Sequence, residues 1–343
     1  MTSQGFLQFL HAMPYIRQLE LIQGFNRIIT EPVLLHLLRR PNLERLALHP
    51  GPCFDDLLLQ RAEAMGIDRC FPALRSFELT EKYPIAVSKI LPTMRHLQEI
   101  KLNLCEEDED EFAEDILAPL GHCKSLQEID FAIALGSSLR LPLQAFLDSI
   151  ESWKFLRRLT LEASIVDYSS EDGTALNPGG LIALAKGLPH IETLSVNFKM
   201  NYGPDVIQEL AAFALHCPQL RELDFAVVID ILKLPHVPDC AVFNSMKKLR
   251  LRSAFACDAF TPATVWIALA DKIDLVLQRY MPLLETFTLS QYAVNDLGNG
   301  SGLVCKEVNK RLKLRAGGLR KFRPSENVKE QLNREMFARA RQA

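Results

Sequence analysis

The chain has 343 residues, of which 48% are hydrophobic, so it can bury a sizeable core. Its formal net charge of −3 argues neither for nor against a nucleic-acid partner, but the charge is unevenly distributed. Residues 306–341 contain twelve Lys or Arg and four Glu, a balance of +8, and the first 305 residues therefore carry −11.

The cysteine spacing and the hydrophobic runs exclude several classes of protein. Eight cysteines occur without a CxxC pair or a His/Cys cluster, which argues against a zinc site or a redox dithiol, and we expect them to be reduced and mostly buried. The N-terminus has no basic stretch before its apolar residues and so is unlike a signal peptide. No apolar run approaches the roughly 18 residues that span a membrane. We therefore expect an intracellular protein, cytoplasmic or nuclear.

One short pattern recurs along most of the chain: often Pro, then an apolar residue, two polar residues, an apolar residue, any residue and an apolar residue. Its copies lie, in chain order, at 14–21, 41–48, 72–79, 95–102, 124–131, 154–161, 189–196, 218–225, 244–251 and 282–289. The last two apolar positions of each copy are two residues apart, so each copy predicts a strand with one buried face. Ten copies predict a parallel sheet in which each strand needs its neighbours to bury that face.

The segments between the strand motifs are predicted to be helices. Proline at the first helical position predicts helices that begin near Pro178, Pro204 and Pro262. Residues 55–65, 109–120 and 141–153 are further predicted helices. The last of these is similar to the opening of an F-box, but the next strand motif leaves no room for a whole one. Strands that alternate with helices predict an α/β fold.

These motifs carry a family resemblance. The P-x-L-x-x-L-x-L strands and irregular spacers resemble leucine-rich repeats of the ribonuclease-inhibitor-like kind, and most of all the repeat regions of fungal F-box proteins, over about residues 6–292. The resemblance implies a horseshoe-shaped solenoid of about ten irregular repeats, with a parallel sheet on the concave face and helices on the convex face. Many such repeats carry Asn or Cys in the turn after the strand, where only Cys105 fits here. We expect the solenoid to span residues 1–297 and a basic, helical cap or tail to span 298–343.

No constellation of residues indicates catalysis, a cofactor or a metal. His122-Cys123 and His216-Cys217 occupy the same repeat register and are predicted to be structural. The acidic run 106–111 lacks the ligand spacing and the turn glycine of a calcium loop, so a solvated loop is predicted. The glycines of 298–302 lack the strand-to-helix context of a phosphate loop, so a flexible linker is predicted. The protein is expected not to be an enzyme and to need no cofactor.

The outward strand positions form the candidate binding face, because the concave strand surface usually carries function in this fold. The candidate residues are Glu78, Glu99, Lys101, Glu128, Asp130, Arg158, Thr160, Glu222, Asp224, Lys248, Arg250 and Arg252. This predicted face is acidic in the middle repeats and basic near its C-terminal end.

The preferred hypothesis is a non-enzymatic protein-binding module. The resemblance extends it to the substrate-recognition part of an F-box-type ubiquitin ligase component, with a cullin-adaptor protein as a partner only if an F-box lies outside this sequence. A stand-alone scaffold or inhibitor-like binder is the alternative. Binding of nucleic acid or another acidic surface through the basic tail is a further one, and no membrane partner is expected.

Overall fold

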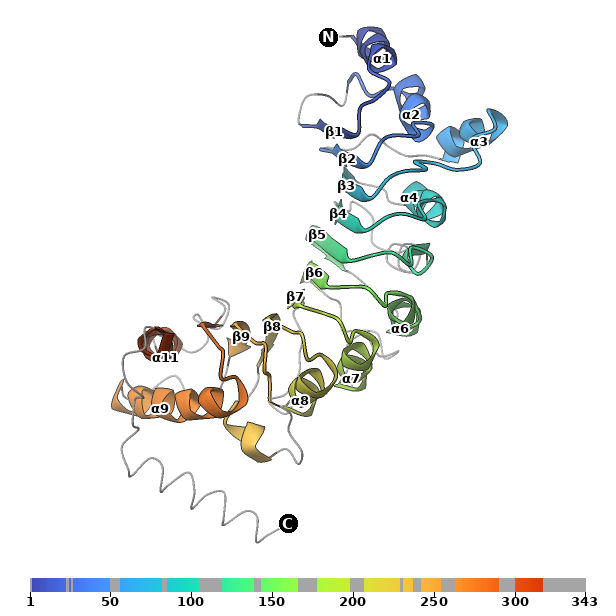
Figure 1. Cartoon of the computed structure of the whole chain (residues 1–343). Coiled ribbons are helices and arrows are strands. Elements are labelled where there is room, and N and C mark those ends of the chain that lie inside the picture. Colours follow the sequence, from blue (N-terminus) through green and yellow to red (C-terminus); the bar gives the residue numbers. More distant parts are fainter. Residues whose placement is uncertain are drawn as a thin grey trace. The chain divides into compact units, whose positions relative to one another are not determined.

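A computed structural model describes most of the chain (Figure 1). The described residues are 2–22, 25, 27–49, 56–81, 85–104, 119–138, 143–165, 178–197, 207–228, 231–236, 242–253, 263–289 and 300–316. The chain divides into two compact units, Met1–Leu188 and Pro189–Ala343. In both units strands alternate with helices and the paired strands are parallel, so the fold is α/β with a solenoid-like repetition.

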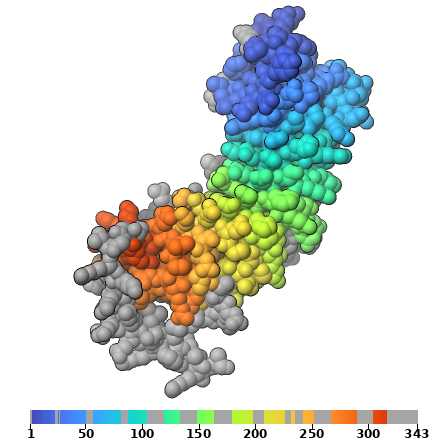
Figure 2. Space-filling view, in the orientation of Figure 1, coloured from blue at the N-terminus to red at the C-terminus, as the bar shows by residue number. Residues whose placement is uncertain are grey.

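The first unit contains six strands, each parallel to the one before it. They are β1 (Gln18–Leu21), β2 (Arg45–Leu48), β3 (Ser76–Glu81), β4 (Glu99–Leu104), β5 (Glu128–Ser138) and β6 (Arg158–Ile165). The helices are α1 (Ser3–Ala12), α2 (Glu31–Leu38), α3 (Asp56–Ala64), α4 (Ile85–Ile90), α6 (Leu143–Ser152) and α7 (Pro178–Gly187), with the 3-10 helix η1 (Leu91–Thr93). Within this unit the strands stack along one side and the helices along the other (Figure 1), and successive repeats form successive bands of the surface (Figure 2).

The second unit contains four strands and three α-helices among its described residues. The strands are β7 (Thr193–Asn197), β8 (Glu222–Val228), β9 (Lys248–Ser253) and β10 (Thr286–Leu289), again parallel. The helices are α8 (Ile207–His216), α9 (Ala263–Tyr280) and α11 (Gly300–Ala316), with the 3-10 helix η2 (Ile231–His236).

The ten strands lie where the repeated motif predicted them, and their register pairs equivalent positions. Leu46 lies beside Phe77 in the sheet, and Ile129 lies beside Leu159. From β2 onward the residue at this inner position is at most 2% exposed in every strand. The predicted buried column is therefore confirmed from β2 onward, and within each unit it forms the core that neighbouring repeats share.

Within each unit, the same hydrogen-bond arrangement ties neighbouring strands together. The Arg17 carbonyl oxygen accepts from two successive amides, Glu44 N at 2.7 Å and Arg45 N at 2.9 Å. Equivalent carbonyls do the same at Glu44, Arg75, Gln98 and Gln127 in the first unit and at Glu192, Arg221 and Lys247 in the second. Because backbone polar groups near the core must be paired, this arrangement fixes where each strand begins.

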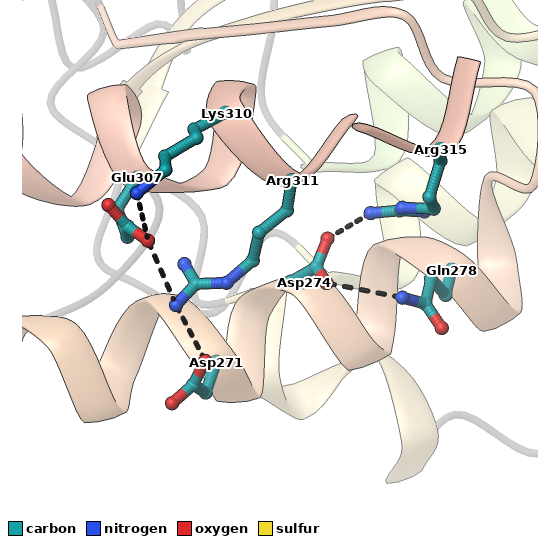
Figure 3. A network of polar contacts seen from close by, with 7 residues as sticks. All are labelled: Asp271, Asp274, Gln278, Glu307, Lys310, Arg311 and Arg315. Carbon is teal, nitrogen blue, oxygen red and sulfur yellow. Dashed lines mark hydrogen bonds and ion pairs between the residues drawn. The ribbon is translucent and has the colours of Figure 1, made fainter. Parts of the chain in front are cut away.

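Helix α11 packs against α9 and holds it through an ion network (Figure 3). Asp274 on α9 is 1% exposed; it pairs with Arg315 on α11 and accepts from Gln278 Nε2 at 3.1 Å. Arg311, which is 5% exposed, lies 2.7 Å from Asp271. Burial raises the pKa of Asp274, although Arg315 and Arg311 oppose the shift.

Helix α11 also covers the outer edge of β10. Asn309 Oδ1 accepts from Phe287 N at 2.9 Å, Asn309 Nδ2 donates to Phe287 O, and Cys305 Sγ lies 3.1 Å from the same oxygen. The flexible linker predicted at 298–302 is wrong for residues 300–302, which begin α11. Glycine costs a helix about 1 kcal/mol, and the burial of Val304 and Val308 on the following turns offsets that cost.

Candidate functional site

The strand register brings the predicted face residues into two columns within each unit. In the first unit one column runs from Gln18 to Arg158 and includes Glu99 and Glu128, which are neighbours in the sheet. The other includes Glu78, Lys101, Asp130 and Thr160 in consecutive strands. These side chains are exposed or half-buried, as alternation along a strand requires.

The outward face of β3–β6 is acidic. Two cations face its carboxylates: Arg158 Nη1 lies 3.0 Å from Glu128 Oε2, and Lys101 occupies the register position beside Asp130. Partial burial raises the pKa of the Asp130 carboxyl; Lys101 and Arg158 oppose the shift, and the nearby carboxylates of Glu162 and Glu78 add to it. Asp130 therefore lies at the centre of an electronegative part of the sheet.

In the first unit a third outward column was missed in the sequence, although Arg252 had been placed at the equivalent position of β9. Strands β3–β6 are longer than the motif, and their register continues through Thr80, Asn103, Ala132 and Glu162. His49, directly after β2, joins this column: its Nδ1 lies 3.2 Å from Thr80 Oγ1, and its Nε2 lies 3.4 Å from Glu78. Extending the period-two alternation by one position would have found Glu162.

In the second unit, charges on the outward face pair across neighbouring strands. Lys248 Nζ lies 2.7 Å from Glu222, and Arg250 Nη1 lies 3.1 Å from Asp224. Arg252 also belongs to β9, but its side chain falls outside the described residues. The carboxylates of β8 therefore offset the two described cations of the end predicted to be basic.

The two His-Cys pairs contain buried thiols. Cys123 is 1% exposed, with its Sγ 3.4 Å from the Leu91 carbonyl oxygen, and Cys217 is 2% exposed. Desolvation by burial raises the pKa of both thiols to about 12. Because a nucleophilic cysteine must be a thiolate, these two are in the wrong protonation state for such chemistry near neutral pH.

Metal-ligand clusters and membrane-spanning helices are both absent from the described ranges. These ranges contain no group of three or more His, Cys, Asp or Glu placed to hold a metal ion. Of the helices in these ranges, none combines the length and the apolar character needed to cross a membrane. The acidic run 106–111 and the basic residues 317–343 lie outside the described part of the chain.

Comparison with models of known protein families gives no match, and comparison with curated proteins gives none either. The fold and the outward face define an α/β repeat protein with a charged, solvent-facing strand surface.

Proposed function

We propose that this chain is a leucine-rich-repeat protein that binds a basic segment of a partner protein on the outward face of β3–β6. The observation that carries the proposal is the charge of that face. Five carboxylates share it with two cations, a net formal charge of −3; they are Glu78, Glu99, Glu128, Asp130 and Glu162, with Lys101 and Arg158. A partner with clustered Lys or Arg would be drawn to such a surface and held in register by it.

The rise in the pKa of Asp130 supports the same choice of partner. Its carboxylate is partly desolvated and has other carboxylates nearby, so its ionised form is disfavoured in the free protein. A cation placed above Asp130 would relieve this repulsion. The outward face of the second unit offers less uncompensated negative charge, because Glu222 and Asp224 already pair with cations of β9.

A matched pair of variants tests the proposal by affinity capture. E99Q/D130N removes two carboxylates from the face, and E63Q/E151Q removes two exposed carboxylates from helices α3 and α6. Proteins captured by the wild type should be retained by the helix variant, lost from the face variant, and weakened when salt rises from roughly 0.05 to 0.5 M. Equal capture by both variants, with both folded by circular dichroism, would contradict the assignment of the face.

The link to F-box-type ubiquitin ligase components is a narrower proposal, and it rests on the resemblance of the repeats alone. It makes the acidic face the substrate-recognition surface and expects a cullin-adaptor protein among the partners of the full-length protein. Capture of partners without any such adaptor would leave the stand-alone scaffold or inhibitor-like binder, which uses the same face. Upstream coding sequence separates these two cases directly, because an in-frame F-box would favour the first.

A further inference from the structure

The first strand has a partly uncovered apolar side. Ile16 and Leu19 are partly exposed, whereas the equivalent Leu43 and Leu46 of the second repeat are 0% exposed. Four large hydrophobic side chains on α1, before β1 and after it are exposed by 45% or more: Phe9, Met13, Tyr15 and Ile22. The last strand differs, because α11 covers its outer edge and Phe287 is 0% exposed. Large apolar side chains exposed on and beside a terminal strand are a feature of interaction surfaces.

The backbone of β1 is arranged to accept a further strand. The carbonyls of Arg17 and Leu21 face β2, since they accept from Arg45 N at 2.9 Å and His49 N at 2.8 Å. Alternation along the strand therefore turns the amides and carbonyls of Gln18 and Glu20 to the opposite, outer edge. Within the described ranges β1 is a terminal strand, with β2 alone beside it. Such an edge is a template for pairing with another chain.

We propose that this edge pairs with the same edge of a second copy of the chain, antiparallel and two-fold symmetric about Leu19. Gln18 then lies opposite Glu20 of the second copy, and the outward backbone groups of both residues form four hydrogen bonds. Leu19 meets Leu19 of the second copy as a non-hydrogen-bonded pair, where side chains approach most closely. The closed two-fold arrangement uses one patch twice and pairs the β1 edge of both copies.

The side chains of β1 favour this register over its neighbours. The chosen register places the amide of Gln18 beside the carboxylate of Glu20, a hydrogen-bonding pair. A register centred on Glu20 sets two carboxylates directly opposite, which is unfavourable. A slip by one residue places outward side chains opposite inward ones. A second copy therefore satisfies both the apolar and the polar side of the edge.

If the proposed function holds, the dimer would also strengthen the binding of a basic partner. Antiparallel pairing with outward residues opposite outward residues puts the two acidic faces on the same side of one joined sheet. A partner with two basic segments would then bind both copies, with an avidity above that of one face. Dimerisation itself stands or fails independently of any partner.

Cysteine cross-linking of the full chain tests the register. In the proposed dimer the two copies of position 19 have Cα atoms about 4.5 Å apart, within the range that a disulfide bridges. The Cα atoms of the two copies of position 20 are separated by roughly 5.5 Å across the strands and by two residues along them. Their distance is therefore about 9 Å, which is too far for a disulfide. On mild oxidation L19C should give a disulfide dimer on a non-reducing gel, and E20C should match the wild type, which carries the native thiols. Equal cross-linking of L19C and E20C, or none, overturns the register.

Sedimentation over a range of protein concentrations tests the dimer itself. The wild type should shift from monomer to dimer as concentration rises. E20P removes an amide that faces the outer edge and spares those that face β2, so this variant should remain folded by circular dichroism and stay monomeric. A wild type that is monomeric throughout, or an E20P variant that dimerises like the wild type, overturns the proposal. If E20P does not fold, the cross-linking of L19C compared with E20C tests the dimer instead.

Discussion

Leu159→Ala tests the inner column of the repeats most directly. Leu159 is 0% exposed in β6 and lies in register with Ile129 of β5, which is 2% exposed. Removing most of a fully buried leucine side chain loses its transfer free energy and leaves a cavity, and such changes cost about 2–5 kcal/mol. Because β5 pairs with β6 along this position, the site can collapse only in part. We expect Leu159→Ala to lower the free energy of unfolding by about 3 kcal/mol.

Urea unfolding followed by circular dichroism measures this loss, and two further variants calibrate it. Ile129→Val removes one buried methylene group and should cost roughly 0.5–1.5 kcal/mol. Thr160→Ala changes the adjacent residue, which faces outward and is only half-buried, and should cost less than about 1 kcal/mol. Equal losses for Leu159→Ala and Thr160→Ala would refute the assignment of inward and outward faces.

Two more predictions concern the ends of the two units. Arg315→Ala should lower the free energy of unfolding by about 2–3 kcal/mol, because Asp274 loses the cation with which it pairs. Arg311 stays near Asp274, so the loss should be smaller than the roughly 3–5 kcal/mol for breaking a fully buried pair. Lys313→Ala, a change at an exposed position of the same helix, should cost little in the same urea titration. Burial and the Arg40 charge lower the pKa of His36, so its neutral form contributes stability that is present above pH about 6.5 and lost as pH falls through the lowered pKa. The urea midpoint should fall between pH 7.5 and about 5.5, and His36→Gln should reduce that fall; an undiminished fall in the variant would assign it to other groups.

Much of the fold was predictable because the repeated motif gives both the spacing of the buried residues and the position of each strand along the chain. Pairs such as Leu46 and Leu48 must face the core if their strand is to be buried at all, so ten copies specify ten strands and their register. The start of α7 at Pro178 followed from the geometry of proline. The first turn of α11 was missed, since Gly300 and Gly302 are poor helix formers and their helix depends on packing against α9.

The outward face was predictable in position but only partly in chemistry. The columns that contain Glu99 and Asp130 follow from alternation alone. The ion pair of Lys248 with Glu222 could not be predicted from the sequence. The two residues are 26 positions apart, and their pairing depends on side-chain rotamers as well as on strand register. Glu162 was missed because β6 continues beyond the motif, and the length of a strand depends on the neighbours with which it pairs.

The distribution of these ion pairs sets where salt should affect binding. In the second unit the carboxylate of Asp224 and the guanidinium of Arg250 largely cancel at a distance, and an exposed pair of this kind contributes less than about 1 kcal/mol to stability. In the first unit neighbouring strands place Glu99 beside Glu128, so one Arg158 cannot neutralise both. Under the proposed function, the described strands β3–β6 therefore attract a basic partner more strongly at long range than β8 and β9 do. Neutralising both members of the Asp224–Arg250 pair should leave the salt dependence of binding unchanged, whereas E99Q/D130N should reduce it.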